Sequence, residues 1–294
     1  MPRSIGVVVS EHIAWGLVEG SVVGEITSYP MEGSGADLLQ AMPVDEMVGR
    51  IANEVKALAE GEPLEALGLA FPGIVRNGVI EESPNLNQLK GAPMAQMIWA
   101  ALADRKIECA KVGVSNDADV VAAGIAAKHG KLDQLVRVWT LGNGVGFGRY
   151  PVSDGVWEGG HIVVTLDPNE KFCGCGGRGH LEGIMGHRAM RLRFLDLEPE
   201  EVFALAKTGD PRCVEFALLW HRALAAATAS SIHMSGPGKF YISGLNARFV
   251  NVGVLNRCVQ EMVKMSSLQG YVFEIVPKSD DMALVGAVVN ALRG

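Results

Sequence analysis

The sequence has little aromatic content, no run of basic residues and no long apolar segment. Aromatic residues make up 6% of the 294 residues, and the formal net charge is −7 at pH 7. The absence of a lysine- or arginine-rich run argues against a nucleic-acid partner. The most apolar helical stretch, residues 216–234, is interrupted by His221 and Arg222, so we expect no membrane span.

Cysteine is also scarce. The chain has five, an odd number, and residues 1–10 lead into a strand-like run without the basic, apolar and small-residue regions of a signal peptide. We therefore expect a cytoplasmic protein with free thiols. Cys109, Cys213 and Cys258 lie in apolar settings, which predicts buried thiols.

The abundant residues indicate a globular α/β protein. Apolar residues make up 48% of the chain, which also has 36 glycines and 13 prolines, and the length suits two domains. In the first half, a three-strand meander leads into strands that alternate with helices, which implies a doubly wound sheet. The predicted strands are residues 5–9, 13–18, 22–27, 67–70 and 109–114, and the predicted helices are residues 44–58, 92–103 and 117–128.

The second half repeats the pattern of three strands followed by helices and further strands, without a residue-level repeat. Its predicted strands are residues 136–141, 145–150, 162–165, 240–243 and 271–276. Its predicted helices are residues 183–194, 199–206, 210–233 and 283–292. This order of elements indicates two halves of similar construction, an inference that the family resemblance described below also supports.

A glycine-rich segment in the second half gathers potential metal ligands. Cys173 and Cys175 are one residue apart, and His161 and His180 lie on either side. Zinc takes four nitrogen or sulfur ligands in a tetrahedron, and glycines let two thiolates turn onto one ion. The four side chains predict a closed, structural zinc site. The alternative is a solvent-exposed loop with free thiols and unrelated histidines.

This segment resembles the signature of the ROK (repressor, open reading frame, kinase) sugar kinases. The signature is Glu-x-Gly-His and, after a variable gap, Cys-x-Cys-Gly-x-x-Gly-Cys-x-Glu; it stands here as residues 158–161 and 173–182. His180 replaces the third cysteine, but histidine is itself a zinc ligand. In the family the two glutamates and the histidine hold sugar hydroxyls, which implies that role for Glu158, His161 and Glu182.

The resemblance also implies a fold. ROK kinases consist of two actin-like ATPase (ribonuclease H-like) domains with a cleft between them. We expect residues 1–118 plus 280–294 to form an N-terminal sugar and phosphate domain, and residues 119–279 to form a C-terminal domain with the zinc loop. In the family the last helix packs back on the first domain, and the chains pair as homodimers.

Residues 115–119 (Ser-Asn-Asp-Ala-Asp) follow a predicted strand, at the edge where open α/β sheets bind their ligands. They resemble the family's Glu-Asn-Asp-Ala-Asn, whose aspartate takes the proton of the attacking sugar hydroxyl. The resemblance implies that Asp117 is the general base of phosphoryl transfer and that Asn116 is a sugar ligand. Helix capping is the alternative, since Ser, Asn and Asp are common N-caps.

Residues 141–148 contain a glycine-rich turn between two predicted strands, in which backbone N–H groups can approach a phosphate closely. The turn resembles the family's Gly-Thr-Gly-Ile-Gly-Gly-Gly, with Asn143 in place of the threonine and Phe147 in place of a glycine. An ordinary hairpin turn is the alternative, because Asn-Gly favours hairpins. The residues expected to bind nucleotide are Gly142, Asn143, Gly144, Gly146 and, in the adenine-side loop, Gly244.

Two shorter segments resemble the family's sugar-pocket segments, Gly-x-Pro-Gly and Pro-Asn-Leu. They are residues 70–73 (Ala-Phe-Pro-Gly) and 84–86 (Pro-Asn-Leu). The resemblance implies a backbone contact from Gly73 and a side-chain contact from Asn85. Plain turn chemistry is the alternative.

The first phosphate loop departs from the family pattern. Family kinases carry Asp-x-Gly-Gly-Thr-Lys between their first two strands, where the aspartate helps to place Mg²⁺. Residues 8–13 read Val-Val-Ser-Glu-His-Ile and lack the aspartate, both glycines and the lysine. Glu11 is a poor substitute near Mg²⁺, because its side chain is longer and its loop has no glycine.

Two functions remain in competition. The first is a glucokinase-like enzyme that transfers phosphate from Mg·ATP to a hexose or N-acetylhexosamine, and the presence of Asp117 favours it. The second is a sugar sensor or pseudokinase without a DNA-binding domain, and the altered phosphate loop favours it. We favour the kinase, because binding energy elsewhere can position the donor. The expected partners are a sugar, ATP and a second copy of the chain, with no nucleic acid and no membrane.

Overall fold

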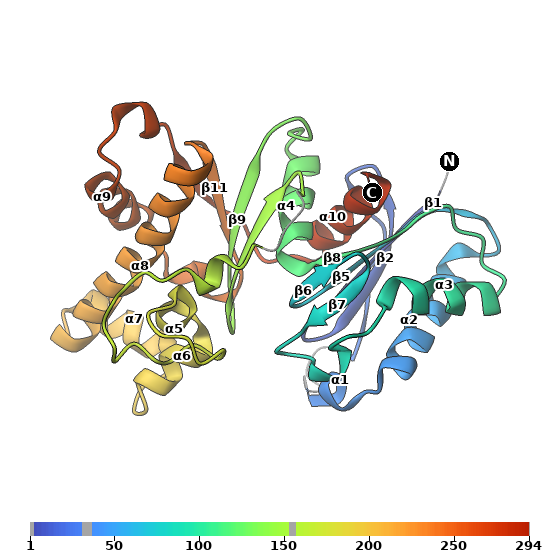
Figure 1. The fold of residues 1–294 in the computed structure, drawn as a ribbon, viewed down its shortest axis with the longest axis horizontal. Coiled ribbons are helices and arrows are strands. Elements are labelled where there is room, and N and C mark those ends of the chain that lie inside the picture. The colour runs from blue at the N-terminus through green and yellow to red at the C-terminus, as the bar shows by residue number, and fades with distance from the viewer. Residues whose placement is uncertain (1–2, 31–36, 153–156, 294) are drawn as a thin grey trace. The chain divides into compact units, whose positions relative to one another are not determined.

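The computed structural model describes residues 3–30, 37–152 and 157–293. The chain forms two compact units, each with its own sheet (Figure 1). The first unit comprises Met1–Val136, Gly148–Val156 and Ser279–Gly294. The second comprises Arg137–Phe147 and Trp157–Lys278. Both units combine helices and strands, so the predicted α/β class is confirmed.

The first unit is built on a sheet with the strand order β3-β2-β1-β5-β8 and with β4 beside β2. β1 pairs with β2 antiparallel and with β5 parallel, and β5 pairs with β8 parallel. This is the predicted meander followed by strands that return through helices. The strands are β1 (Arg3–Val9), β2 (Ile13–Glu19), β3 (Val22–Val23), β4 (Thr27–Tyr29), β5 (Leu64–Phe71) and β8 (Val112–Asn116).

Helices cover both faces of this sheet, because alternate residues of the buried strands point to opposite sides. Val7 of β1 packs in one core cluster with Ile51 of α2 and Ile98 of α3. Val8 packs in a second cluster with Val120 of α4 and Leu284 of α10. The remaining elements are α1 (Asp37–Ala41), α2 (Val44–Ala59), α3 (Met94–Asp104), α4 (Asp117–Lys128), α10 (Asp280–Arg293) and the hairpin of β6 (Ile74–Arg76) and β7 (Val79–Glu82).

A row of three glycines lets α10 lie directly on the sheet. Gly6 of β1, Gly68 of β5 and Gly113 of β8 are in register on neighbouring strands. A Cβ atom on Gly6 would lie 2.5 Å from the Leu284 carbonyl oxygen, and one on Gly113 would lie 2.6 Å from the Ala291 Cα. A Cβ on Gly68 would overlap the Ala287 backbone. Only glycine permits this approach, since real Cβ atoms do not come so close to backbone.

The helices α4 and α10 also pack closely on each other (Figure 1). A Cβ on Gly124 of α4 would overlap the Met282 carbonyl, and one on Gly286 of α10 would overlap the Val120 carbonyl. The boundary that we predict near residue 119 falls inside α4. Because α4 packs on α10, the whole helix stays with the first unit, which extends to Val136 before the chain enters the second.

The second unit is built on a sheet with the order β10-β9-β11-β12, in which β11 is parallel to both β9 and β12. Phe216 and Trp220 of the long helix α8 are buried in its core with Trp139 of β9. The apolar stretch of α8 therefore belongs to the core. The elements are β9 (Val136–Leu141), β10 (Val145–Tyr150), α5 (Leu181–Met185), α6 (His187–Arg193), α7 (Pro199–Thr208), α8 (Pro211–Ser235), β11 (Lys239–Ser243), α9 (Val252–Met262) and β12 (Val272–Ile275).

Several sequence predictions are wrong in detail. The predicted helix over residues 183–194 is the two helices α5 and α6, and the predicted strand over residues 22–27 is replaced by the short strands β3 and β4. Residues 162–165 form no strand of this sheet; Val163 makes only an isolated bridge to His180, and the Val164 N–H donates to the Gly179 carbonyl over 2.8 Å. The backbone partners of these residues lie in the glycine-rich loop before α5, so the sheet has no third meander strand here. Cys109 is half-buried rather than buried, whereas Cys213 and Cys258 are buried.

Over the described ranges, none of the helices is both long enough and apolar enough to cross a membrane.

Candidate functional site

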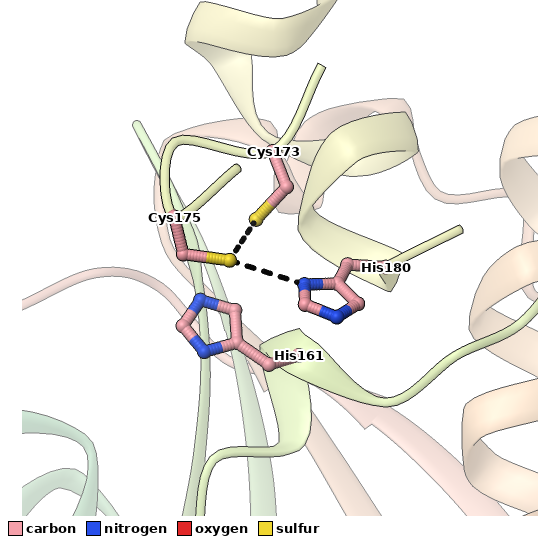
Figure 2. Close-up of side chains that lie close together, drawn as sticks. All are labelled: His161, Cys173, Cys175 and His180. Carbon is pink, nitrogen blue, oxygen red and sulfur yellow. Dashed lines mark hydrogen bonds between the residues drawn. The ribbon is translucent and has the colours of Figure 1, made fainter. Parts of the chain in front are cut away.

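The four predicted metal ligands lie together in the second unit. Figure 2 shows the side chains of His161, Cys173, Cys175 and His180 converging on one point. Their donor atoms all lie within 4.8 Å of one another. The Cys175 Sγ is 3.4 Å from the Cys173 Sγ and 3.3 Å from the His180 Nδ1. The rings of the two histidines are stacked, with centroids 5.3 Å apart.

This donor set fits a tetrahedral zinc ion. With Zn–S near 2.3 Å and Zn–N near 2.0–2.1 Å, tetrahedral geometry separates the donor atoms by about 3.3–3.8 Å. The expected separation is about 3.8 Å for two sulfurs and about 3.5 Å for sulfur and nitrogen. The observed 3.4 Å between the two Sγ atoms and 3.3 Å between the Cys175 Sγ and the His180 Nδ1 are each within about 0.4 Å of these values. Glycine makes the convergence possible: a Cβ on Gly177 would overlap the His180 ring, and one on Gly183 would lie 3.0 Å from the Cys173 nitrogen.

The surroundings of the cluster disfavour charge on its own side chains. Burial, the Cys175 thiol and the Glu182 carboxylate raise the pKa of the Cys173 thiol to about 12. Burial and the neighbouring His161 lower the pKa of His180, while Glu182 acts against this. Burial disfavours charge at both side chains, while the nearby carboxylate of Glu182 raises both pKa values and is the group here that favours a cation.

A second group of possible metal ligands consists of His187, Glu198 and Glu200. Both glutamates are exposed, and each already has a cationic partner. Arg191 pairs with Glu198 over 3.0 Å, and Arg248 pairs with Glu200. Because these guanidinium groups already neutralise the carboxylates, we assign no metal to this group.

The Glu-Gly-Gly-His segment packs tightly on β10. Gly159–His161 form a 3₁₀ turn, and a Cβ on Gly159 would lie against Phe147, while one on Gly160 would overlap the Val145 carbonyl. Phe147 itself packs on Trp139, with ring centroids 4.5 Å apart. The two glycines thereby fix the turn that carries the exposed Glu158, whose Oε2 lies 3.7 Å from the His161 Nδ1.

Glu182 connects the metal-ligand loop with the glycine-rich turn between β9 and β10. Its Oε2 accepts the Val145 N–H over 3.1 Å, and the Cys173 thiol donates to its Oε1 over 3.5 Å. Only glycine fits at position 144, because a Cβ on Gly144 would overlap the Glu182 Oε2. The family resemblance implies a sugar contact for Glu182, and in the structure its carboxylate makes these two hydrogen bonds within the second unit.

Four of the predicted nucleotide-binding residues lie close together. The turn of Gly142, Asn143 and Gly144 is closed by the Gly142 N–H, which donates to the Gly144 carbonyl over 3.0 Å. Gly244, with a φ of +99°, lies against it, since a Cβ there would overlap the backbone of Leu141. Gly146 lies further along, inside β10.

The start of α6 and Asn246 also hold this turn, and sequence reasoning missed both. The His187 N–H and the Asn246 Nδ2 donate to the Gly142 carbonyl over 2.9 and 3.1 Å, and the Arg188 N–H donates to the Asn143 carbonyl over 3.4 Å. Only the position of Asn246 directly after Gly244-Leu245 could have drawn attention to it. No local signal connects His187 with the turn.

In the first unit, Asn116 ends β8 and Asp117 begins α4. Asn116 is the N-cap: its Oδ1 accepts the N–H groups of Ala118 and Asp119 over 2.8 and 3.3 Å. Its Nδ2 donates to the Gly73 carbonyl over 2.7 Å. The half-buried Asp117 therefore stands next to the cap, at the carboxyl end of a parallel strand.

The Gly73 turn is held from two sides. Gly73 has a φ of +102°, and a Cβ there would overlap the Glu82 carbonyl and lie 2.8 Å from the Ser83 Cα. Asn116 binds its carbonyl. Asn85, the other predicted residue of this segment, is exposed. The first unit thus brings Gly73 beside Asn116.

The connection between β1 and β2 is a short turn. The Ser10 N–H donates to the His12 carbonyl over 2.9 Å. The His12 Nε2 lies 2.8 Å from the Asp280 Oδ2, at the start of α10. This geometry differs from an open, glycine-rich phosphate loop, in keeping with the residues that replace the family motif.

Residues 40–293 match the ROK family. The chain is 29% identical over 281 residues to a glucokinase from Thermotoga maritima, covering 83% of this chain and 84% of that protein. It is 28% identical to a glucokinase from Pyrobaculum calidifontis, covering 88% and 89%. A kanosamine kinase from Amycolatopsis mediterranei is 26% identical, with 68% of each chain covered.

Solved structures agree with the fold. A ROK hexokinase from Thermus thermophilus has a TM-score of 0.76 at 24% identity, covering 98% of this chain and 97% of that one. A ROK family glucokinase from Streptomyces griseus, in complex with glucose and AMPPNP, has a TM-score of 0.69 at 21% identity, covering 99% and 100%. The predicted fold of two actin-like ATPase domains is therefore confirmed.

Proposed function

The chain belongs to the ROK family and is a sugar kinase, and we propose that it transfers the γ-phosphoryl group of ATP to a hydroxyl of a hexose or an N-acetylhexosamine. The observation that carries this proposal is the placement of Asp117 at the start of α4, directly beside the cap residue Asn116. Phosphoryl transfer needs a base, positioning and stabilisation of charge on the transferred group.

Asp117 acts as the general base that accepts the proton of the attacking sugar hydroxyl. Capping is the alternative role for such a residue, and here Asn116 performs it by accepting the N–H groups of Ala118 and Asp119. The Asp117 Oδ1 also accepts the Ala118 N–H, over 3.0 Å, but shares it with Asn116. The carboxylate of Asp117 is thus not required as the N-cap. A positioned base near a reacting hydroxyl contributes about 10²–10⁴ in rate.

The sugar ligands in this proposal are those implied by the family. Glu158 and Glu182 accept hydrogen bonds from hydroxyl groups and His161 accepts or donates one, while Gly73 and Asn85 are the further sugar contacts that the family implies. Asn116, which the family implies as a sugar ligand, contributes to sugar binding mainly by holding the Gly73 turn and the start of α4 in place. Both ends of its amide already bind protein groups. Carboxylates and imidazole are suited to this task, since each can accept a hydroxyl hydrogen.

The nucleotide donor binds through the glycine-rich turn. The donor-binding residues in this proposal are Gly142, Asn143, Gly144 and Gly146, with Gly244 on the adenine side. Asn143 and Gly144 offer their backbone N–H groups to phosphate oxygens, while the Gly142 N–H closes the turn. Mg²⁺ accompanies ATP and neutralises charge on the phosphates. Because the turn between β1 and β2 lacks the family's aspartate and glycines, the glycine-rich turn carries more of the positioning.

We propose a structural zinc ion held by His161, Cys173, Cys175 and His180. The donor separations and the nearby carboxylate of Glu182 support it. With four protein ligands the ion has no open position, so its role is to hold the loop that carries Glu182 and not to activate water.

The assembly and location in this proposal follow the family. The chain forms a cytoplasmic homodimer with no nucleic-acid partner. Light scattering should give a mass close to that of two chains of 31.3 kDa. A mass near one chain would exclude the dimer.

A coupled assay of ATP consumption over glucose, mannose, fructose, N-acetylglucosamine and N-acetylmannosamine tests the function directly. Asp117→Asn should reduce turnover by about 10²–10⁴, since an amide cannot take the proton, while sugar affinity stays within a few-fold. Asp119→Asn is the matched control: its oxygen can still accept the Arg149 N–H, so turnover should stay within a few-fold.

Glu158→Gln should instead weaken sugar binding, because it alters an acceptor for a hydroxyl. Full turnover by Asp117→Asn would identify a different base. Sugar binding by the unmutated protein without turnover of any sugar tested would identify a sugar-binding protein in place of a kinase.

A further inference from the structure

Asn246 is a buried amide at the centre of three segments. It lies in the 3₁₀ turn Leu245–Phe249 and has no exposed surface. Its Nδ2 donates to the Gly142 carbonyl over 3.1 Å and to the Met185 carbonyl over 3.5 Å. Since these partners are acceptors, this end of the amide must be the nitrogen. The oxygen therefore faces His187, whose Nδ1–H donates to it over 3.2 Å.

These contacts fix the direction of the peptide units in the glycine-rich turn. The Gly142 carbonyl points to Asn246 and to the His187 N–H, and the Asn143 carbonyl points to the Arg188 N–H. In a planar trans peptide the C=O and N–H groups point in opposite directions. The N–H groups of Asn143 and Gly144 therefore both point away from α6 and Asn246.

We propose that Asn246 is a positioning residue for the nucleotide phosphates, which holds the Gly142 carbonyl so that two successive backbone N–H groups face the donor. Adjacent N–H groups on one side of a turn form an anion site, and a site fixed before binding loses less free energy on ordering. This inference rests on the proposed function, because it takes the turn to be the phosphate site.

The contacts distinguish this role from that of an ordinary buried amide. Met185 and His187 lie on either side of the junction between α5 and α6. By bonding to both of them and to the Gly142 carbonyl, the Asn246 amide links this junction to the glycine-rich turn. A purely structural amide would affect stability alone. A positioning amide also affects nucleotide affinity, without affecting the sugar.

Asn246→Asp is the most informative variant. It keeps an oxygen for the His187 Nδ1–H but cannot donate to the Gly142 carbonyl. The Kd for AMPPNP with Mg²⁺, measured by calorimetry, should rise about tenfold or more. The KM for ATP should rise by a similar factor. The Kd for sugar measured without nucleotide should stay within about twofold.

Asn251→Ala is the matched control, because Asn251 is another asparagine of the second unit and caps α9 by accepting the Val254 N–H. Its loss should lower the melting temperature and leave the AMPPNP affinity unchanged. If Asn246→Asp does not fold, His187→Phe serves instead. It keeps the backbone bond to Gly142 but removes the donor that fixes the amide, and should weaken AMPPNP binding in the same direction.

The outcomes separate this inference from the function on which it rests. If the unmutated protein binds no AMPPNP, the proposed function fails and this inference fails with it. If the unmutated protein binds AMPPNP and the folded Asn246→Asp or His187→Phe variant binds it equally well, the function stands and the inference alone is overturned. Selective loss of nucleotide affinity supports both.

Discussion

The Asn116 side chain donates to the Gly73 carbonyl over 2.7 Å while its other end caps α4. One amide thus connects the turn after β5 to the helix that begins with Asp117. The two segments are 43 residues apart in sequence. A change at Asn116 should therefore affect both the helix and the turn, and the two effects can be separated.

Asn116→Ala should lower stability by about 1 kcal/mol through loss of the cap, and should also weaken sugar binding because the Gly73 turn is released. Asn116→Asp caps about as well as asparagine but cannot donate to Gly73. It should keep the cap, lose about 1 kcal/mol with the Gly73 hydrogen bond, and still weaken sugar binding. Urea unfolding and sugar titration measure the two effects. Unchanged sugar affinity in both variants would show that the Gly73 turn does not contribute to the pocket.

The metal-ligand cluster predicts one zinc ion per chain. Metal analysis of protein purified without added metal should find it, and Cys173→Ser should abolish it. Chelation should lower the melting temperature, because an ion that binds only the folded site stabilises the fold. Cys258→Ser is the control, since this cysteine is buried outside the cluster and should leave the zinc content unchanged. Equal zinc in the Cys173 variant and the unmutated protein would contradict the ligand assignment.

The glycine row predicts a large effect from one methyl group. Gly68→Ala should destabilise the protein by at least about 1–3 kcal/mol, because the new Cβ would overlap the Ala287 backbone. Gly49→Ala is the matched control: it lies inside α2, where its Cβ would meet only Arg105 at 3.7 Å. There alanine should stabilise by about 0.5–1 kcal/mol. Urea midpoints that move together in both variants would refute the close approach of α10.

His221 predicts how stability depends on pH. Its Nδ1–H donates to the Ala217 carbonyl over 2.7 Å, and its Nε2 accepts the Asn251 N–H over 2.9 Å, so the buried ring is neutral. Burial lowers its pKa. The unfolded chain therefore binds this proton at a higher pH than the folded chain does. Stability should fall as the pH drops below about 6.5, with a contribution of up to about 1.4 kcal/mol per pH unit.

Urea midpoints at pH 7, 6 and 5 measure this contribution. His221→Gln should remove it, although the variant is less stable at pH 7. His233→Gln is the control, because this histidine of the same helix is exposed and should leave the pH dependence unchanged. A His221→Gln protein with the full pH dependence of the unmutated chain would assign the effect to another group.

Much of the fold could be predicted because its signals are local. The alternation of apolar residues gives the bounds of β9 and β10 correctly, and the segment before residues 117–128 carries the asparagine that caps α4. The metal-ligand cluster was also predictable, since its four residues lie within 20 positions of one another. Residues 162–165 were not, because their backbone partners lie in the loop and not in the sheet.

The contacts that hold the glycine-rich turn could not be predicted in the same way. Asn246 is separated from Gly142 by 104 positions, and nothing in its neighbourhood indicates which carbonyl it binds. His187 has no local pattern that distinguishes it from an ordinary helix residue. Such partners are chosen by the tertiary packing of α5, α6 and the loop after β11, which no single segment encodes.

The position of α10 in the chain has a consequence during synthesis. The ribosome makes β1, β5 and β8 first, then the entire second unit, and only afterwards the helix that covers the glycine row. Until α10 is made, the apolar face of the first sheet on which this helix packs is only partly covered. The unit that is encoded first is therefore the one that finishes folding last. A chain that ends before Asp280 would contain every strand and helix of the second unit but would lack the helix that packs on the glycine row of the first.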